Sequence, residues 1–410
     1  MSFRPHGFWI LLTLVVLASC ATPPAPPPAT TPDEVSADPV FPTPAALQPQ
    51  VAFWRNVYAV WGRDQVALHD NRYMSLIYEV VTLPGEVGEG YTAEQQALVK
   101  GRYEQLKTGL RQLEIKTAAG APLTPEEQAL ASRLQNLGGA GAIAGAGDRL
   151  RSQRGLRERF KRGLEISGRY DAAFREVFRE AGLPEDLAYL PHVESSFQTH
   201  ATSSVGAVGV WQFMPGTARQ FMTVNAALDE RRDPVASAQG AARYLGNAYQ
   251  RLGVWPLALT SYNHGVGGMA VAQQQFGNDF TAITRNYSGR GFGFASRNFY
   301  AEFLAAREIA RNPQRFFPEG LHYEPPLNLD RVRLRQAVSA PTLADYYEVN
   351  RWELNQVNPA WNPAAQTGRL ALPAGTLVWL PAGSVARLAQ RGMAGRAVAL
   401  ADPVTTARPR

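Results

Sequence analysis

The chain has 410 residues, of which 45% are apolar, and its formal net charge is +6. This length and apolar content are enough for two or three domains with a sizeable core. Cys20 is the only cysteine, which excludes an intramolecular disulfide, so the stability of the fold must come from packing.

The first twenty residues have the features of an export signal. Arg4 gives a short basic start, and the apolar run that follows, Phe8 to Ala18, is too short to span a bilayer. Residues 1–20 are therefore predicted to be a signal peptide. The closing Leu17-Ala-Ser-Cys20 resembles the bacterial lipoprotein cleavage box, which implies a lipid on Cys20. An ordinary secretory signal with an incidental cysteine is the alternative.

The next thirty residues, 21–50, contain ten prolines and are predicted to form an extended, disordered tether. Such a tether would let a soluble body reach away from a membrane. Ala21, in place of Asp after the cysteine, implies the periplasmic face of the outer membrane, by resemblance to lipoprotein sorting rules.

Residues 51–150 are predicted to be helical. Trp54, Tyr58 and Trp61 recur at helical spacing, the apolar residues from Leu76 to Val80 continue a helical face, and the Gly-rich stretch 138–147 indicates a loop. A basic run, 149–162, follows and is predicted to be a solvated helix face. Nucleic acid is not expected as a partner, because an exported protein has little access to it. An anionic envelope surface is the more reasonable partner.

A single acid, Glu194, stands in the apolar stretch 187–221. Leu187, Leu190 and Glu194 fall at i, i+3 and i+7, so a helix would place the carboxyl on a stripe of core leucines. Burial raises the pKa of a carboxyl and enables it to donate a proton near neutral pH. The alternative is a glutamate that caps or pairs locally at a helix end.

Three short blocks occur in order along this part of the chain: Glu194-Ser195, Gly209 to Gln212, and Tyr262-Asn263. Together they resemble the hallmarks of the lysozyme-like lytic transglycosylases, and residues 157–309 look similar to the membrane-bound murein transglycosylase D branch. The resemblance implies a mainly α protein, with a goose-type lysozyme-like catalytic domain over residues 151–324 and a helical N-terminal region before it.

The resemblance also implies roles for individual residues. Glu194 would be the catalytic acid and base, and Tyr262 would hydrogen-bond and orient it. The residues implied to bind substrate are Ser195, Gln212, Tyr262, Asn263 and Tyr300. One aromatic residue on an apolar helical stripe is usually a core residue, which is the alternative for Tyr300.

The sequence departs from the family pattern at two positions, where Ser261 and His264 replace the usual alanines. Neither change removes a reacting group, but His264 alters the charge of the expected cleft. Helix starts are predicted at Pro184, at Asp233-Pro234 and at Pro256, and Gly265 suits the end of the last of these helices.

Beyond Pro325, short apolar runs flank a helical middle, and the predicted order is strand, helix, helix, strand. Residues 325–385 thus resemble a small α+β LysM glycan-binding module, with Asn358-Pro359 and the strand around Trp379 as matches. The usual Gly-Asp before the first helix is missing, so a degenerate module that only packs on the catalytic domain is the alternative. The tail, 386–410, gives no clear signal.

The chemistry follows from the number of acids. Glycosidases usually need two carboxylates, and no other Asp or Glu occurs from Ser195 to Leu228. One glutamate suffices if the muramoyl C6 hydroxyl attacks its own anomeric carbon, which gives a 1,6-anhydro product from peptidoglycan. No metal or cofactor is expected, because the chain has no H-E-x-x-H motif and no phosphate loop. The rival hypothesis is a catalytically silent peptidoglycan-binding or scaffolding lipoprotein.

Overall fold

The computed structural model describes residues 38–391 and 400–404. The predicted signal peptide, Cys20 and most of the predicted tether lie outside the described residues. Within the described part, no helix is both long and apolar enough to cross a bilayer.

The end of the predicted tether is part of the folded body. Phe41 is 1% exposed and packs against the rings of Trp255 and Phe303. A short 3-10 turn, η1 (Ala45–Leu47), leads into helix α1 (Gln48–Ala59). The prediction of a tether up to residue 50 was therefore wrong for its last part, because the apolar side chains of this segment find a place in the core.

A three-stranded antiparallel sheet with the order β2-β1-β3 interrupts the region that was predicted to be helical. Its strands are β1 (Gln65–Asp70), β2 (Ile77–Thr82) and β3 (Leu150–Arg154). The apolar residues of β2 were interpreted as a helical face. They include Ile77, Val80 and Val81, whose branched side chains suit a pleated surface once a partner strand is present.

Two polar helices lie between β2 and β3 in the chain, α2 (Ala93–Ala118) and α3 (Pro125–Gly138). Each begins with a complete capping box, formed by Thr92 with Gln95 and by Thr124 with Glu127. Their buried leucines share a small core with β1. The Gly-rich stretch after α3 is a loop that contains two short turns, η2 (Ala140–Ala142) and α4 (Ala146–Arg149).

The basic run that begins at Arg149 bonds largely within the protein. Arg149 contacts Asp70 at 2.9 Å, the Arg154 guanidinium donates to three backbone carbonyls, and Lys161 contacts Glu319 at 3.1 Å. The run extends over β3 and α5 (Arg157–Ser167). The interpretation as a solvated helix face was therefore wrong for most of the run.

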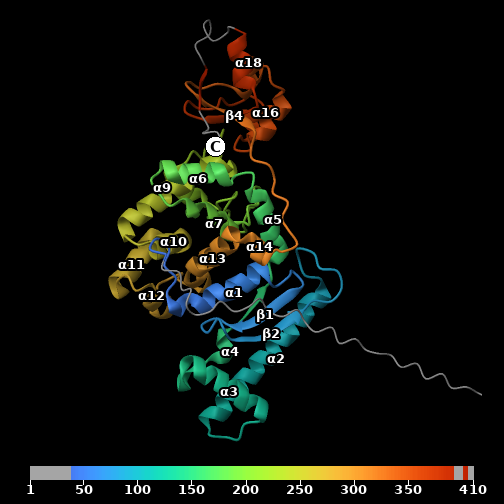
Figure 1. The fold of residues 1–410 in the computed structure, drawn as a ribbon, viewed down its shortest axis with the longest axis vertical. Helices are drawn as coiled ribbons and strands as arrows, with labels where there is room; N and C mark the ends of the chain where they lie inside the picture. The colour runs from blue at the N-terminus through green and yellow to red at the C-terminus, as the bar shows by residue number, and fades with distance from the viewer. Residues whose placement is uncertain (1–37, 392–399, 405–410) are drawn as a thin grey trace, which may run out of the picture. The chain divides into compact units, whose positions relative to one another are not determined.

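The helical domain is built around α13 (Phe294–Arg311), which packs against α1, α7 and α10 (Figure 1). Figure 1 labels most of the other elements, which are α6 (Asp171–Glu180), η3 (Glu185–Tyr189), α7 (Leu190–Glu194), α8 (Pro215–Phe221), η4 (Glu230–Arg232), α9 (Pro234–Leu252), α10 (Trp255–His264), α11 (Val266–Phe276), α12 (Phe280–Asn286) and α14 (Pro313–Phe316). The predicted cap of α9 is confirmed, since Asp233 accepts from the amides of Val235 and Ala236.

The C-terminal module has a helical middle between two strands, as predicted, but a third short helix, α17 (Pro363–Gln366), follows the two that were predicted. Its elements are β4 (Leu329–Leu334), α15 (Ala340–Tyr347), α16 (Arg351–Val357), α17 (Pro363–Gln366), β5 (Leu377–Pro381), α18 (Ser384–Gln390) and β6 (Ala401–Pro403). The tail contributes β6 as the third strand of a sheet with the order β5-β4-β6, which the sequence did not predict. A glycan-binding role for the module stays a prediction.

A loop of the helical domain, residues 225–229, packs against the module and shares hydrogen bonds with it. The amide of Asp229 donates to the Ala360 carbonyl at 2.8 Å, and the amide of Asn362 donates to the Ala227 carbonyl at 2.9 Å. Leu228 is 1% exposed within the core of the module. Backbone hydrogen bonds and a shared apolar residue therefore join the two parts.

Candidate active site

Glu194 is the last residue of α7, and Leu187 and Leu190 are fully buried, as predicted. Leu190 lies in the same helix as Glu194, whereas Leu187 belongs to the preceding 3-10 turn η3, so the prediction of one continuous helical stripe was wrong. The chain turns sharply after the acid: Ser196 and Phe197 have φ values of 53° and 58°. Left-handed conformations are unusual for such residues and cluster at functional sites. The turn sends Phe197 into the core beside Phe174, and it leaves the carboxyl of Glu194 half-buried at the helix end.

The environment of Glu194 disfavours its charged form. Burial, and then the negative charge of Glu302, raises the pKa of Glu194 from its ordinary value of 4.5 to about 8. The carboxyl therefore keeps its proton near neutral pH. That is the state a general acid needs before it protonates a leaving group.

Glu302 is a second acid at this site, and the sequence analysis missed it. It lies on α13, which packs against α7, and burial raises its pKa to about 8. The expectation of a lone carboxyl was therefore wrong. A signal was available, because Glu302 is the only charged residue in the otherwise apolar run 299–306, much as Glu194 is in its own stretch.

Two tyrosines, Tyr58 and Tyr262, lie near enough to Glu194 for its charge to affect their pKa values. Burial is the main cause that places the pKa values of Tyr58 and Tyr262 well above their ordinary value, so both hydroxyls keep their protons; the charges of Glu302 and Glu194 add to it at Tyr58, and the charge of Glu194 adds to it at Tyr262. The Tyr262 hydroxyl donates to the Trp211 carbonyl at 2.9 Å. The resemblance implied a bond to Glu194 instead, and among the described residues the structure gives the hydroxyl this other partner.

The segment Gly209 to Gln212 is held by close backbone contacts. Gly209 has a φ of 78°, and a Cβ there would lie 2.0 Å from the Arg231 carbonyl oxygen, so only glycine fits. Gln212 has a φ of 49°, and its side-chain nitrogen donates to the Gly209 carbonyl at 2.7 Å. Ser195, 2% exposed, donates to the Val210 carbonyl at 2.9 Å, which ties the end of α7 to this segment.

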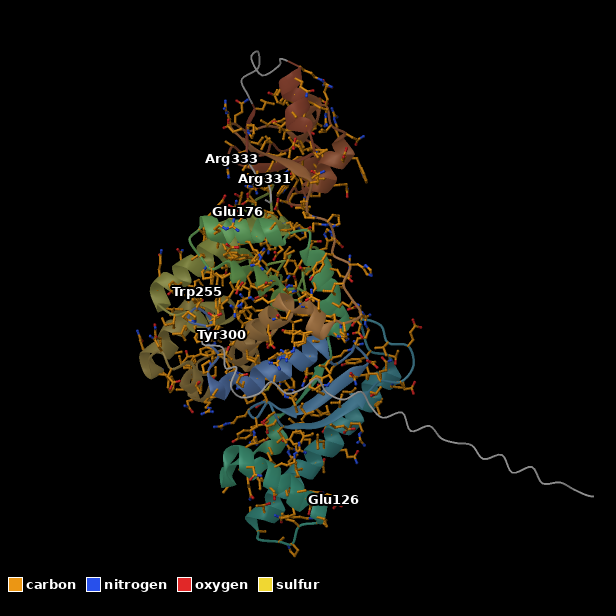
Figure 2. All side chains as sticks on the ribbon, viewed as in Figure 1. Glu126, Glu176, Trp255, Tyr300, Arg331 and Arg333 are labelled. Carbon is orange, nitrogen blue, oxygen red and sulfur yellow. The ribbon has the colours of Figure 1, made fainter. Side chains whose placement is uncertain are left out.

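Of the two remaining predicted site residues, Asn263 is exposed and Tyr300 is buried. Asn263, exposed near the end of α10, accepts a hydrogen bond from Ser296 at 2.7 Å. Tyr300 is 0% exposed, and its hydroxyl donates to the Pro42 carbonyl at 2.9 Å (Figure 2). Tyr300 is thus a core residue in this structure, so the expectation that it contacts substrate was wrong and the alternative is confirmed.

His192, two residues before the acid, is also a core residue. It stacks on Phe160 with the ring centroids 5.0 Å apart, and burial lowers its pKa to about 3. The described residues contain no cluster of three or more His, Cys, Asp or Glu side chains able to hold a metal ion.

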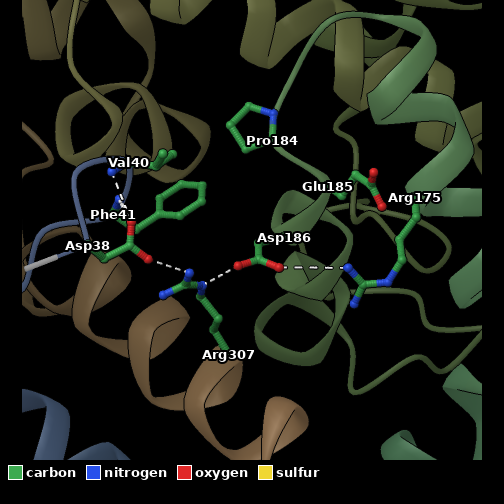
Figure 3. A pocket seen from close by; sticks show the side chains of 8 residues that line it. All are labelled: Asp38, Val40, Phe41, Arg175, Pro184, Glu185, Asp186 and Arg307. Carbon is green, nitrogen blue, oxygen red and sulfur yellow. Dashed lines mark hydrogen bonds and ion pairs between the residues drawn. The ribbon is translucent and has the colours of Figure 1, made fainter. Parts of the chain in front are cut away.

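A cavity of about 370 Å³ beside the N-terminal segment is separate from these residues (Figure 3). Arg307 lies between Asp38 and Asp186 in this cavity, and its Nε is 2.6 Å from Asp186. Asp186 also faces Arg175 at 3.7 Å. Each cation is matched by a carboxylate, so this network fastens residues 38–41 to the helical domain.

Comparison with known proteins places the candidate site inside a family domain. Residues 173–283 match the family model described as the transglycosylase SLT domain. The chain is 29% identical over 186 residues to the membrane-bound lytic murein transglycosylase D of Escherichia coli (strain K12), which covers 44% of this chain and 40% of that protein. It is 33% identical over 114 residues to the membrane-bound lytic murein transglycosylase F 2 of Alkalilimnicola ehrlichii, which covers 26% and 24% of the two chains.

Among solved structures, the 70 kDa soluble lytic transglycosylase of Escherichia coli aligns with a TM-score of 0.32 and 17% identity, over 52% of this chain and 44% of that one. The chain thus spans less than half the length of these relatives. Glu194, Gln212, Tyr262 and Asn263 fall within the matched residues 173–283, whereas Glu302 lies beyond them.

Proposed function

Because the chain carries a transglycosylase SLT domain, we propose that it is a peptidoglycan lytic transglycosylase, which cleaves the β-1,4 bond between MurNAc and GlcNAc without water. The observation that carries the proposal is the state of Glu194. This glutamate ends a short helix within the matched domain, is half-buried, and has a pKa raised to about 8.

In the proposed reaction, Glu194 first donates its proton to the oxygen that links MurNAc to GlcNAc, and the glycosidic bond breaks. The carboxylate that results then removes a proton from the C6 hydroxyl of the same muramoyl residue. The hydroxyl oxygen bonds to the anomeric carbon, which gives a 1,6-anhydro sugar and returns the proton to Glu194. The reaction needs no water and no cofactor.

The neighbours of Glu194 have distinct proposed roles. Gln212 and Asn263, both accessible, bind the sugar. Ser195 positions the acid through its bond to the Val210 carbonyl, because its side chain is too buried to reach a substrate. Tyr262 positions the acid through Trp211, whose carbonyl it holds. The domain is proposed to extend over residues 151–324, with residues 325–385 as a LysM-like module.

Glu302 supports a second candidate, a hydrolytic reaction. Two carboxyls that flank a glycosidic bond can divide the work of acid and base, or of acid and nucleophile. Burial raises the pKa of Glu302 to about 8, so this carboxyl is largely protonated at neutral pH. A protonated acid is neither a base nor a nucleophile, and we therefore favour the transglycosylase reaction. A silent wall-binding or scaffolding lipoprotein remains the third candidate.

The proposed location is the cell envelope. A relative that is named a membrane-bound transglycosylase supports it, as does the lipoprotein-like box at Cys20. We propose a lipid on Cys20 and a position on the periplasmic face of the outer membrane, with peptidoglycan strands as the partner.

Digestion of purified sacculi, followed by mass spectrometry of the products, tests the proposal. Wild-type protein is expected to release muropeptides that end in anhydro sugars, each one water lighter than the product of hydrolysis. Glu194→Gln is expected to keep the fold and to lower turnover by roughly 10²–10⁴-fold. Reducing-end products would select the hydrolytic candidate, and folded wild-type protein that binds sacculi without releasing products would select the silent one.

A further inference from the structure

A second cavity, of about 220 Å³, has walls from both the helical domain and the C-terminal module. Tyr170, His200, Arg232 and Asp233 line it from the domain, and Gln356 and Trp379 line it from the module. It exists only where the two parts meet. Thr199 and His200 in its wall follow Glu194 by a few residues, so the turn after the acid leads directly to the cavity.

Both carboxylate oxygens of Asp233, the acid that lines this cavity, already accept hydrogen bonds from the protein. One carboxylate oxygen accepts from the amides of Val235 and Ala236 at 2.8 and 2.9 Å, and the other accepts from the indole nitrogen of Trp379 at 2.6 Å. Burial raises the pKa of Asp233, and these three donors oppose that rise because they stabilise its negative charge. Asp233 therefore shapes the cavity and is not free to bind a cationic ligand.

Arg232, an arginine that lines the cavity, has no close carboxylate partner in the parts of the chain that the structure describes. No side-chain hydrogen bond of Arg232 occurs among the described residues, and its nearest carboxylate oxygen, on Asp229, lies 3.8 Å away. Asp229 is itself held by Arg231 through two bonds of 2.8 and 2.9 Å. Arg232 thus presents a guanidinium, with its five N–H donors, at the rim of the cavity.

A second arginine, Arg331, lies behind the aromatic wall of the cavity. Figure 2 labels it on β4, and its guanidinium is 5.4 Å from the centre of the Trp379 ring. Its Nε is buried and lacks a hydrogen-bond partner in the described part of the chain. The acids whose charges act on Arg331 are Asp233 and Glu180. Arg169 also lines the cavity, but it pairs with Glu324 at 2.6 Å. Arg232 is therefore the cation with uncommitted donors that faces the cavity.

We propose that this cavity binds the carboxylate-bearing end of a short peptide, the kind of group that a peptidoglycan strand carries as its stem. Arg232 would hold the carboxylate, Gln356 would bond to the peptide amide, and Tyr170 and Trp379 would contact the apolar side chains. The volume is below the roughly 300–1,000 Å³ of pockets for drug-sized ligands, which suits one or two amino acids better than a sugar chain.

This inference rests on the proposed function and extends it to the substrate class. A strand whose stem occupies the cavity would be held by the segment that follows Glu194 in the chain, so the protein would prefer glycans that carry peptides over bare glycans. Because two separate walls supply the contacts, the selectivity would depend on the module.

The test measures binding of the free tetrapeptide stem, and of the same peptide with its carboxylates amidated, to the full chain by calorimetry. We expect the acid form to bind at least about ten-fold more tightly than the amide, since a hydrogen bond to a charged group has roughly this worth. Arg232→Gln and Gln356→Ala, one from each wall, should each weaken binding of the acid form. Arg251→Gln, an exposed arginine at the far end of α9, is the matched control and should not.

Equal binding of acid and amide, or unchanged binding by Arg232→Gln, would overturn the inference. A kinetic arm compares kcat/KM on glycans with and without stems, where Arg232→Gln should lower only the first. The binding arm needs no turnover, so it stands even if sacculus digestion gives no anhydro products. Sacculus digestion therefore tests the proposed function, whereas binding of the free peptide tests the peptide site.

Discussion

Trp379 of the C-terminal module donates a hydrogen bond of 2.6 Å to Asp233, the residue that caps α9 of the helical domain. The module therefore helps to fix the start of a helix in the core of the domain. Trp379 is 6% exposed, and its ring belongs to the large core of that domain rather than to the core of the module.

The first prediction concerns this bond. Trp379→Phe should lower the free energy of unfolding by about 1.5–3 kcal/mol, because a hydrogen bond to a buried carboxylate is lost while most of the aromatic packing remains. Trp352→Phe is the control, since Trp352 is 72% exposed on the same module. Chemical denaturation measures both, and equal stability of the two variants would contradict the role of the bond.

Phe41 tests whether the segment before α1 is part of the fold. Phe41→Ala should lower the free energy of unfolding by about 3–5 kcal/mol, because it leaves a cavity beside Trp255 and Phe303. The neighbouring Val40 is 37% exposed, so Val40→Ala should change little. A Phe41→Ala protein as stable as wild type would mean that this segment is a free tether after all.

Glu302 should tune the pH range of activity. If Glu194 acts first as an acid, activity declines as the pH rises through its pKa of about 8. The charge of Glu302 is the second cause of that raised pKa, after burial, so Glu302→Gln should move this decline to lower pH. Glu308→Gln, on the same helix but paired with Arg55, should leave the profile in place. If Glu302→Gln leaves the pH profile of activity unchanged, the charge of Glu302 does not influence the pKa of Glu194.

The raised pKa of Glu194 also predicts how stability depends on pH. An unfolded glutamate ionises near its ordinary pKa of 4.5, whereas Glu194 in the fold stays protonated up to about 8. As the pH rises between these values, the unfolded wild-type chain releases a proton that the folded chain retains, so the wild type loses stability. Glu194→Gln cannot ionise and should become the more stable protein across this window.

Melting temperatures measured from pH 4.5 to pH 8 test this expectation, whose window is set by the two pKa values of Glu194. The difference between Glu194→Gln and wild type should be smallest at the acid end and should grow with pH. Glu104→Gln, on the exposed surface of α2, is the control for a glutamate that lies away from the candidate site. A gap that shrinks with rising pH would mean that Glu194 is ionised in the fold.

The lipid-anchor hypothesis is tested by Cys20→Ala in the full chain. The variant should leave the membrane fraction while its activity on soluble glycan chains stays unchanged, because Cys20 is far in sequence from the candidate site. Co-sedimentation of the variant with membranes would show that something other than this cysteine holds the protein there.

Several features of this protein follow from short stretches of its sequence. The burial of the leucines before Glu194, the Asp233 cap, the glycine that ends α10 and the helical middle between two strands of the module are all present. Each depends on residues a few positions apart, where helical periodicity, capping and turn preferences act directly. The order of the three motif blocks likewise pointed to the family domain that residues 173–283 match.

Other features were decided only by tertiary structure. The segment that resembled a helical face is β2, which pairs with β1, and β1 pairs in turn with β3, which lies far along the chain, so the sheet is complete only in the tertiary structure. Glu302 gains its importance from the packing of α13 on α7, and the Tyr262 hydroxyl meets Trp211 across the fold. Such contacts join residues that are distant in sequence, and their geometry depends on how whole elements pack. Local sequence patterns predicted the burial that is the first cause of the raised pKa of Glu194, but not the nearby charge of Glu302, which depends on how α13 packs on α7.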